Sequence, residues 1–215
     1  MKDYCPLVLD LRNKKCLVVG GGAVALRKIK TLVSSGARVL VVSPTLCREV
    51  QEMVERAELH YAGAAYGVHL LDDVLLVVSS TDNREFNGRV SRDCFARQVL
   101  VNNVHDPSLC SFFFPSVVSR GPLSIAISTE GRSPAWARLV REQLEEIFSA
   151  DCEAFLEFLG KIRPLVLRAV EDPQKRKEVF RQLAGREFYR SFQTLGAEEL
   201  ERKALEFVEH YIKHK

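Results

Sequence analysis

The stretch KCLVVGGGAVALRKIKTLVSSGARVLVVSP, residues 15–44, constrains the fold more than any other part of the chain. Its first apolar run leads directly into three glycines, as in a buried parallel strand that ends in a tight turn. Apolar side chains then recur near helical spacing until a Ser-Gly pair at 35–36, and a second apolar run ends at proline. A strand, a helix and a strand within about thirty residues indicate a right-handed βαβ unit.

The glycine turn has the spacing of a phosphate-binding loop. Gly20, Gly22 and Ala25 form G-x-G-x-x-A. The first glycine allows a tight turn, the second lets the main chain approach a diphosphate, and the small third residue lets the helix pack closely. The helix that begins near Ala23 would offer the diphosphate its N–H groups and its positive dipole end. The sequence therefore predicts a dinucleotide site, with a bare structural turn as the alternative.

The second strand ends without the acidic residue that usually binds the adenosine ribose. Ser43 and Pro44 stand there, and no arginine adjoins them to receive a 2′-phosphate. This position therefore does not discriminate between NAD and NADP.

Strands and helices continue to alternate until Asp106. After a short lead-in strand expected at Leu7–Leu11, the later elements are expected at 49–57 (helix), 59–62 (strand), 72–80 (strand), 83–98 (helix) and 99–104 (strand). Repeated units of this kind predict an α/β fold with a Rossmann-like doubly wound parallel sheet.

Beyond Asp106 the pattern changes. Two apolar runs joined by a turn at 119–122 predict a β-hairpin, and a helix should follow at 133–148. The remainder is almost wholly helical, with breaks expected near Pro164, Pro173, Gly185 and Gly196. We expect three domains: an NAD-binding Rossmann domain at 1–110, a hairpin and helix at 111–150, and a C-terminal helical domain at 151–215.

Composition excludes several classes. A net charge of +3 is too small to indicate a nucleic-acid partner, and no run approaches the roughly 18 apolar residues that span a membrane. The first residues lack a signal-peptide core, so a cytoplasmic location is expected. The six cysteines contain no C-x-x-C pair, and His210 and His214 are expected to be solvated, so no metal site is predicted.

Three segments together are similar to a known family: VVGGGAVALRKIKTLVSSGARVLVVSP, SSTDNREFNGRVS and VNNVHDPSLCSFFFPSVVSRGPLSIAISTEGRSPAWARLVREQLE. They resemble the precorrin-2 dehydrogenase/sirohydrochlorin ferrochelatase family, the N-terminal part of siroheme synthase, over about residues 1–150. The resemblance implies that NAD⁺ oxidises the tetrapyrrole precorrin-2 to sirohydrochlorin in siroheme biosynthesis. Some members also insert Fe²⁺, and this is left open here. It further implies a homodimer with the hairpin region and C-terminal helices at the interface.

The resemblance also implies site residues. The family's cofactor contacts fall on Gly20, Gly21, Gly22, Ala23, Val24, Ser43, Pro44 and Thr45, and its essential aspartate falls on Asp106. Thr129 corresponds to a serine that is phosphorylated in one branch of the family. His105 departs from the family, which more often has an apolar residue there, and Glu130 stands where glycine is common.

The chemistry of these residues suits an oxidation. Asp106 follows the carboxyl end of a strand, where doubly wound sheets place ligands, and a carboxylate there could accept or relay a proton. His105 beside it is the second catalytic candidate: it could shuttle protons or contact a metal, or be an ordinary loop histidine.

Charge within the middle of the chain suits an anionic substrate. Residues 84–141 contain eight arginines, no lysine and four acidic residues. Arginine's planar fork suits carboxylates, and the implied substrate carries many of them. The candidates for substrate binding are Arg120, Arg132 and Arg138, with Thr129 beside them. Two alternatives stay open: a chelatase without dehydrogenase activity, and a nucleotide-sensing module without catalysis.

Overall fold

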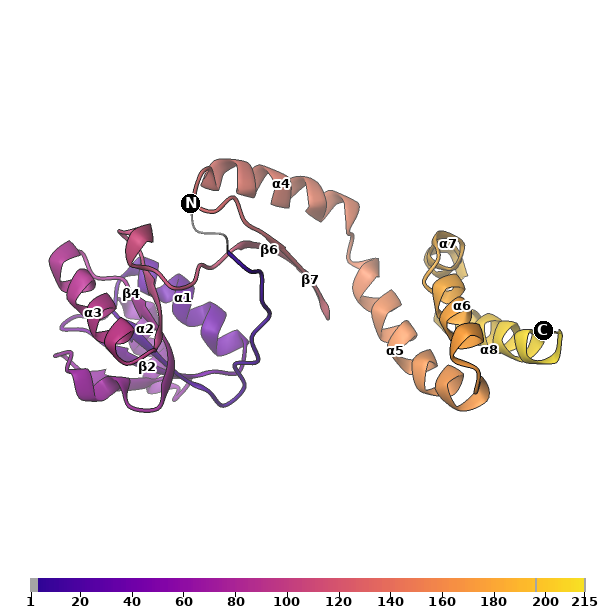
Figure 1. The fold of residues 1–215 in the computed structure, drawn as a ribbon, viewed down its shortest axis with the longest axis horizontal. Coiled ribbons are helices and arrows are strands. Elements are labelled where there is room, and N and C mark those ends of the chain that lie inside the picture. Colours follow the sequence, from indigo (N-terminus) through magenta and orange to yellow (C-terminus); the bar gives the residue numbers. More distant parts are fainter. Residues whose placement is uncertain (1–3, 196, 215) are drawn as a thin grey trace. The chain divides into compact units, whose positions relative to one another are not determined.

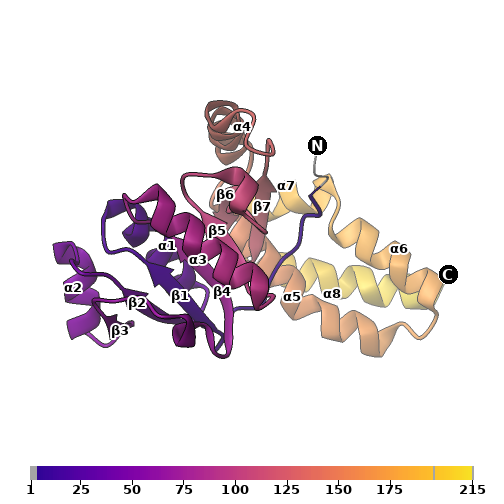
Figure 2. The ribbon, with the colours of Figure 1, turned by 60° about the vertical axis from the view of Figure 1, so that its left-hand side comes forward.

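The chain forms two compact units, one up to Phe114 and one from Pro115 onward (Figures 1 and 2). The structure, a computed structural model, describes residues 4–195 and 197–214, without the side chains at 197–198 and 209–214. The expected boundary at 110–111 lies four residues before the observed one. The helices expected as a separate domain at 151–215 belong to the second unit.

The first unit is built on a five-stranded parallel sheet with strand order β3-β2-β1-β4-β5. This confirms the predicted doubly wound α/β fold. Its elements are β1 (Lys15–Val19), α1 (Ala23–Ser34), β2 (Arg38–Val42), α2 (Arg48–Glu55), β3 (His60–Gly63), η1 (Val68–Leu71), β4 (Val74–Ser79), α3 (Arg84–Ala96), β5 (Leu100–Asn103) and η2 (Pro107–Leu109). The strand order reverses between β1 and β4, which is where such sheets bind ligands beyond the carboxyl ends of the strands.

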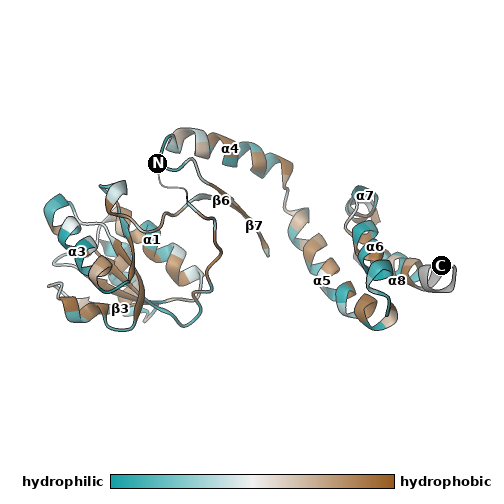
Figure 3. Cartoon of the chain, viewed as in Figure 1, coloured by the Kyte–Doolittle hydropathy of each residue, from teal (hydrophilic) through white to brown (hydrophobic). Residues whose placement is uncertain are grey.

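Both faces of the sheet are covered. Cys16 and Val18 of β1 point to the side where α1 and α2 pack, while Leu17 and Val19 point to the side of η1 and α3. All four are at most 1% exposed, which explains why the strand is a continuous apolar run. Figure 3 shows the same contrast, with apolar colour on the strands and both colours on the helices.

The lead-in strand expected at Leu7–Leu11 is wrong. The segment has no regular secondary structure and joins neither of the described sheets. Leu7 and Val8 are 76% and 99% exposed, and Asp10 instead accepts hydrogen bonds from Arg12. Strand propensity alone was insufficient because no neighbouring strand offers its backbone groups.

The second unit begins with the predicted hairpin, formed by β6 (Ser116–Arg120) and β7 (Leu123–Ile127), and continues into α4 (Pro134–Ile147). Ser133 caps α4 by accepting a hydrogen bond from Trp136 N at 3.2 Å. The hairpin also contacts the next helix, α5 (Asp151–Ala169), since a Cβ added at Gly121 would lie 2.4 Å from the Glu153 side chain. The hairpin, α4 and the later helices lie in the same compact unit, and their division into two domains stays a prediction.

The later helices are α5, α6 (Pro173–Leu183), α7 (Arg186–Leu195) and α8 (Ala197–His214). Their core gathers Phe155, Phe158, Ile162 and Leu200. The break expected at Pro164 is wrong, because α5 runs through it. Proline has no N–H to donate to the carbonyl oxygen four residues earlier, and its ring crowds the residue at that position. In α5 that residue is Gly160, which has no side chain. Across the described part of the chain, none of the helices is long and apolar enough to cross a membrane.

Candidate dinucleotide site

The glycine loop lies at the carboxyl end of β1 and is packed tightly on two sides. Gly20 has a φ of +126°, and a Cβ there would lie 2.7 Å from the carbonyl oxygen of Ser80. A Cβ at Gly21 would lie 2.2 Å from the carbonyl oxygen of Thr45, and Cys47 N donates to Gly21 O at 2.8 Å. Only glycine fits either position without displacing the main chain of a neighbouring loop.

Gly22 has the opposite surroundings. A Cβ there would meet no atom within 4 Å, so this glycine faces open space. It is the N-cap of α1, where no side chain accepts a hydrogen bond from the first turn and no acidic residue lies within that turn. Ala23 and Val24, which begin the helix, are exposed. The N-terminus of α1 therefore offers uncapped N–H groups and a positive dipole end next to open space, which fits a diphosphate.

The residues that follow β2 support this loop. Ser43 is 6% exposed, and its Oγ donates to Thr45 O at 2.7 Å. Ser43 N donates to Gly63 O at 3.1 Å, and Tyr61 Oη donates to Ser43 O at 2.9 Å. Ser43 therefore holds the 43–45 segment in place next to Gly21. Pro44 and Thr45 are exposed, so they are the members of this segment that a cofactor can reach.

Replacing Gly21 by alanine is expected to lower the free energy of unfolding by about 1–3 kcal/mol, because the added methyl group overlaps the Thr45 carbonyl. Gly22→Ala is the matched control and should cost about 1 kcal/mol or less, since the methyl group enters open space at a helix N-cap. Denaturant unfolding of both variants measures the difference. Equal losses would contradict the packing described for Gly21.

Asp106 and His105 follow β5 at the same edge of the sheet. Asp106 Oδ1 accepts hydrogen bonds from Ser108 N at 2.9 Å and Ser108 Oγ at 2.7 Å, while Oδ2 has no hydrogen-bond partner in the described chain. The Ser108 hydroxyl, with its backbone N–H next, lowers the pKa of Asp106. The carboxylate is therefore ionised at neutral pH, with one oxygen not engaged by the described chain.

His105 is exposed, and its ring is held by the loop after β4. His105 Nε2 lies 2.8 Å from the carbonyl oxygen of Thr81. A carbonyl oxygen can only accept, so Nε2 carries the proton and a neutral His105 has its basic lone pair on Nδ1.

Buried polar side chains beneath these loops were missed by the sequence reasoning. Ser79, Asn87, Ser91 and Asn103 are at most 4% exposed and are hydrogen-bonded to one another. The signal that could have found them is polar residues at the carboxyl ends of otherwise apolar strands, SS at 79–80 and NN at 102–103. Such groups are buried only where partners satisfy them.

The predicted substrate-binding residues lie in the second unit. Arg120 donates to the carbonyl oxygens of Ser119, Glu145 and Phe148, at 2.8 to 3.2 Å, so it fastens the end of α4. Arg138 pairs with Glu142, and Thr129 Oγ1 accepts from Ser133 N at 3.2 Å. Substrate binding by these residues stays a prediction.

Arg132 is the remaining candidate. It lies 3.7 Å from Glu130, the residue that stands where the family commonly has glycine. Glu130 has a φ of +53°, in the region that favours glycine. The loop therefore keeps a glycine-like backbone although it carries a carboxylate.

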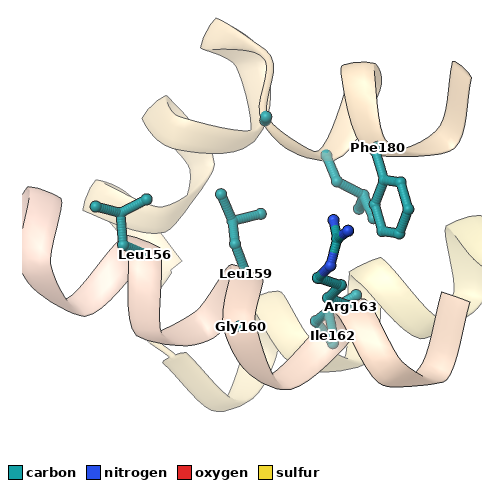
Figure 4. Close-up of a pocket in the computed structure, with 8 residues that line it drawn as sticks. Leu156, Leu159, Gly160, Ile162, Arg163 and Phe180 are labelled. Carbon is teal, nitrogen blue, oxygen red and sulfur yellow. The ribbon is translucent and has the colours of Figure 1, made fainter. Parts of the chain in front are cut away.

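A cavity of about 310 Å³ lies between α5 and α6 and is drawn in Figure 4. Its walls are mostly apolar, and the guanidinium of Arg163 lies over the Phe180 ring at 5.0 Å. None of the residues predicted for the site lines it.

Metal ligands are not gathered anywhere in the part of the chain that the structure describes, where no group of three or more His, Cys, Asp or Glu could hold an ion. The side chains of His210 and His214 lie outside the described residues.

The geometry defines a class: a Rossmann-type protein whose glycine loop and uncapped helix N-terminus suit the diphosphate of a dinucleotide. A family model described as "Putative NAD(P)-binding" matches residues 7–116, and a second, "Sirohaem biosynthesis protein central", matches 120–147. The chain belongs to the first of these families, whose model covers half of it. Both matches confirm the resemblance stated from the sequence.

Known proteins agree with these models. Siroheme synthase 1 of Serratia proteamaculans is 35% identical over 186 residues, 86% of this chain and 39% of that protein. The siroheme synthase of Sodalis glossinidius is 40% identical over 184 residues, 86% of this chain and 37% of that protein. The chain thus spans less than two fifths of these relatives. A solved structure titled "SirC, precorrin-2 dehydrogenase" is 28% identical with a TM-score of 0.78, over 97% of this chain and 100% of that one.

Proposed function

We propose that the protein is an NAD-dependent precorrin-2 dehydrogenase, which oxidises precorrin-2 to sirohydrochlorin in siroheme biosynthesis in the cytoplasm. The observation that carries the proposal is an uncapped helix N-terminus and an ionised carboxylate at one edge of one sheet. The similarity to a solved precorrin-2 dehydrogenase along nearly the whole chain supports the choice of substrate.

The chain's own residues divide the work. The glycine loop and the first turn of α1 bind the diphosphate, and Pro44 and Thr45 border the adenosine side. When bound, NAD⁺ supplies the hydride acceptor. Asp106 presents Oδ2 as an acceptor for the proton that the substrate loses, or for a cation. Because its pKa is lowered, it acts more by negative charge than as a strong base.

The test is to incubate the purified protein with precorrin-2 and NAD⁺ and to follow NADH formation at 340 nm. NADH and sirohydrochlorin in equal amounts are expected, and no NADH formation would contradict the proposal. A nucleotide-sensing module would bind NAD⁺ without forming NADH. Adding Fe²⁺ to sirohydrochlorin, in the presence and absence of NAD⁺, then tests metal insertion. Insertion without any dehydrogenation would favour a chelatase.

We also propose a homodimer through the hairpin region. Val117 on β6 and Trp136, Leu139 and Ile147 on α4 are large apolar residues that are exposed in the described unit. Exposed apolar side chains gathered on neighbouring elements are typical of an association surface. Analytical ultracentrifugation should give twice the chain mass, and a Trp136→Glu variant should shift the equilibrium toward monomer.

Substrate affinity is expected to depend on salt. Arg132 and Arg138 are 63% and 76% exposed, and the proposed substrate is highly anionic. Raising the salt from about 0.1 M to about 1 M shortens the Debye length from about 10 Å to about 3 Å. We therefore expect the KM for precorrin-2 to rise severalfold while kcat changes little. A KM that stays constant across this range would argue against charge-driven binding.

A further inference from the structure

We propose that Asn103 is the positioning residue for Asp106, and that a buried chain of side chains ties it to the loop after β4. This inference rests on the proposed function, because Asp106 matters only if the site is catalytic. Asn103 is the last residue of β5 and is 4% exposed. It therefore cannot act on substrate itself and would act through the turn that it holds.

The carboxamide oxygen of Asn103 closes the Asp106 turn. Its Oδ1 accepts hydrogen bonds from His105 N at 3.0 Å and from Asp106 N at 3.3 Å. An asparagine side chain that accepts from the backbone two and three residues later makes a side-chain-closed turn. This turn lies directly after β5, and Asp106 is the N-cap residue of η2.

The carboxamide nitrogen of Asn103 fixes the orientation of the side chain. Nδ2 donates to Ser91 Oγ at 3.1 Å, and Ser91 Oγ donates to Asn87 O at 3.1 Å. Asn87 Nδ2 in turn donates to Thr81 O at 2.8 Å. These three bonds run from the Asp106 turn through α3 to the loop after β4.

A second connection closes the circuit. The same carbonyl oxygen of Thr81 accepts from His105 Nε2 at 2.8 Å. Thr81 follows Ser80, whose carbonyl oxygen lies against Gly20 of the cofactor loop. The Asp106 turn is therefore tied to the loop that supports the glycine turn by one buried route and one exposed route.

Burial strengthens the buried route through Asn103, Ser91 and Asn87. Ser91 and Asn87 are fully buried, so water does not compete for the bonds that Ser91 makes with Asn103 and Asn87. Within the described residues, no buried side-chain nitrogen or oxygen lacks a partner. A polar network that is fully satisfied in this way specifies one arrangement of the loops.

The kinetic test is a double-mutant cycle on NADH formation with Asn103→Ala and Asp106→Ala. Alone, Asn103→Ala should lower kcat about tenfold or more, because small displacements of a catalytic group are costly. In the Asp106→Ala background it should change kcat less than about twofold, because the group it positions is gone. Equal losses in both backgrounds would overturn the proposal. NAD⁺ affinity, measured by calorimetry, should change much less than kcat, because the hydrogen bonds of the Asn103 side chain go to Ser91, His105 and Asp106 and not to the glycine loop.

Asn102→Ala is the matched control. Asn102 is the preceding residue of β5 and is also buried, but its side chain donates to Phe112 O at 3.1 Å and to Cys110 Sγ at 3.8 Å rather than accepting from the amides of His105 and Asp106. This variant should lose comparable thermal stability without accelerating amide exchange in the Asp106 turn. Fast exchange there in Asn102→Ala would overturn the proposal, since the effect would then follow from loosening β5 in general.

Amide hydrogen exchange tests the same inference without activity. In Asn103→Ala, the amides of His105 and Asp106 should exchange about tenfold faster or more, since their acceptor is removed. Rates within about twofold of the wild type would overturn the proposal. If Asn103→Ala does not fold, Ser91→Ala removes the acceptor of Asn103 Nδ2 and should still accelerate exchange at the same amides, whereas wild-type rates in Ser91→Ala would overturn the proposal. If the wild type forms no NADH, the proposed function fails, while exchange still decides what holds the turn.

Discussion

The Gly22→Asp variant is expected to lose NAD⁺ binding while keeping or slightly increasing the stability of the fold. Gly22 has φ −89° and ψ −171°, extended backbone that any residue adopts, and its side-chain direction is open. Aspartate is a good N-cap, and its carboxylate would accept from the N–H groups of the first turn of α1. Those are the groups that the diphosphate needs, so the variant fills the site with its own anion.

The expected loss of affinity is about a hundredfold or more, since the variant blocks the donors and adds like charge. Titration calorimetry with NAD⁺ measures it, and thermal unfolding measures the stability change, which should be a gain of a few tenths of a kcal/mol. Ser34→Asp puts the same charge at the exposed far end of α1 and should leave NAD⁺ affinity unchanged. Unaltered affinity in Gly22→Asp would remove the diphosphate from this loop.

Replacing Asp106 by asparagine is expected to lower the rate of precorrin-2 oxidation by about a hundredfold. Asparagine keeps the shape of the side chain and can still accept from Ser108 N, so the turn should persist while the negative charge is lost. Affinity for NAD⁺ should not change, because the glycine loop belongs to β1 and α1. If the chain inserts iron, Asp106→Ala should abolish that activity too. Unchanged rates of both reactions would remove Asp106 from the mechanism.

The pH dependence follows from the Ser108 hydrogen bonds. They lower the pKa of Asp106 in the folded protein below its ordinary value. The hydrogen bonds therefore stabilise the fold fully at any pH above that ordinary pKa. This stabilisation is lost as the pH falls through the pKa of the folded protein. Asp106 should therefore stay ionised across the neutral range and produce no fall in rate there. Ser108→Ala removes the largest cause of the shift, so the pKa of Asp106 should rise toward its ordinary value, measurable by NMR titration of the carboxyl carbon.

Local patterns predicted the parts of the fold that depend on local chemistry. The glycine loop and the strands around it follow from short-range spacing, because a strand buried on both faces must be apolar and a diphosphate loop must lack side chains. The hairpin and the Ser133 cap follow from turn and capping residues in the same way. The break expected at Pro164 failed because the proline was considered alone, although the position four residues earlier, which its ring crowds, is a glycine.

The support of Asp106 could not be predicted in this way. Asn103, Ser91 and Asn87 lie on two elements, and their hydrogen bonds depend on how α3 packs against β5. Polar residues at strand ends are common, and the sequence does not show which hydrogen-bond partner each of them has. The two asparagines at 102–103 show how far the sequence can predict such support. Asn103 accepts a hydrogen bond within the Asp106 turn, whereas its neighbour Asn102 donates to Phe112, and the sequence does not distinguish them.

The strand order has a consequence for how the chain acquires its structure during synthesis. All five parallel strands lie within the first compact unit, and both β1–β2 and β2–β3 join neighbours along the chain. Only β4 must return past β2 and β3 to reach β1. We therefore expect the polypeptide leaving the ribosome to remain protease-sensitive until β4 has emerged, and then to become resistant before the second unit has been made.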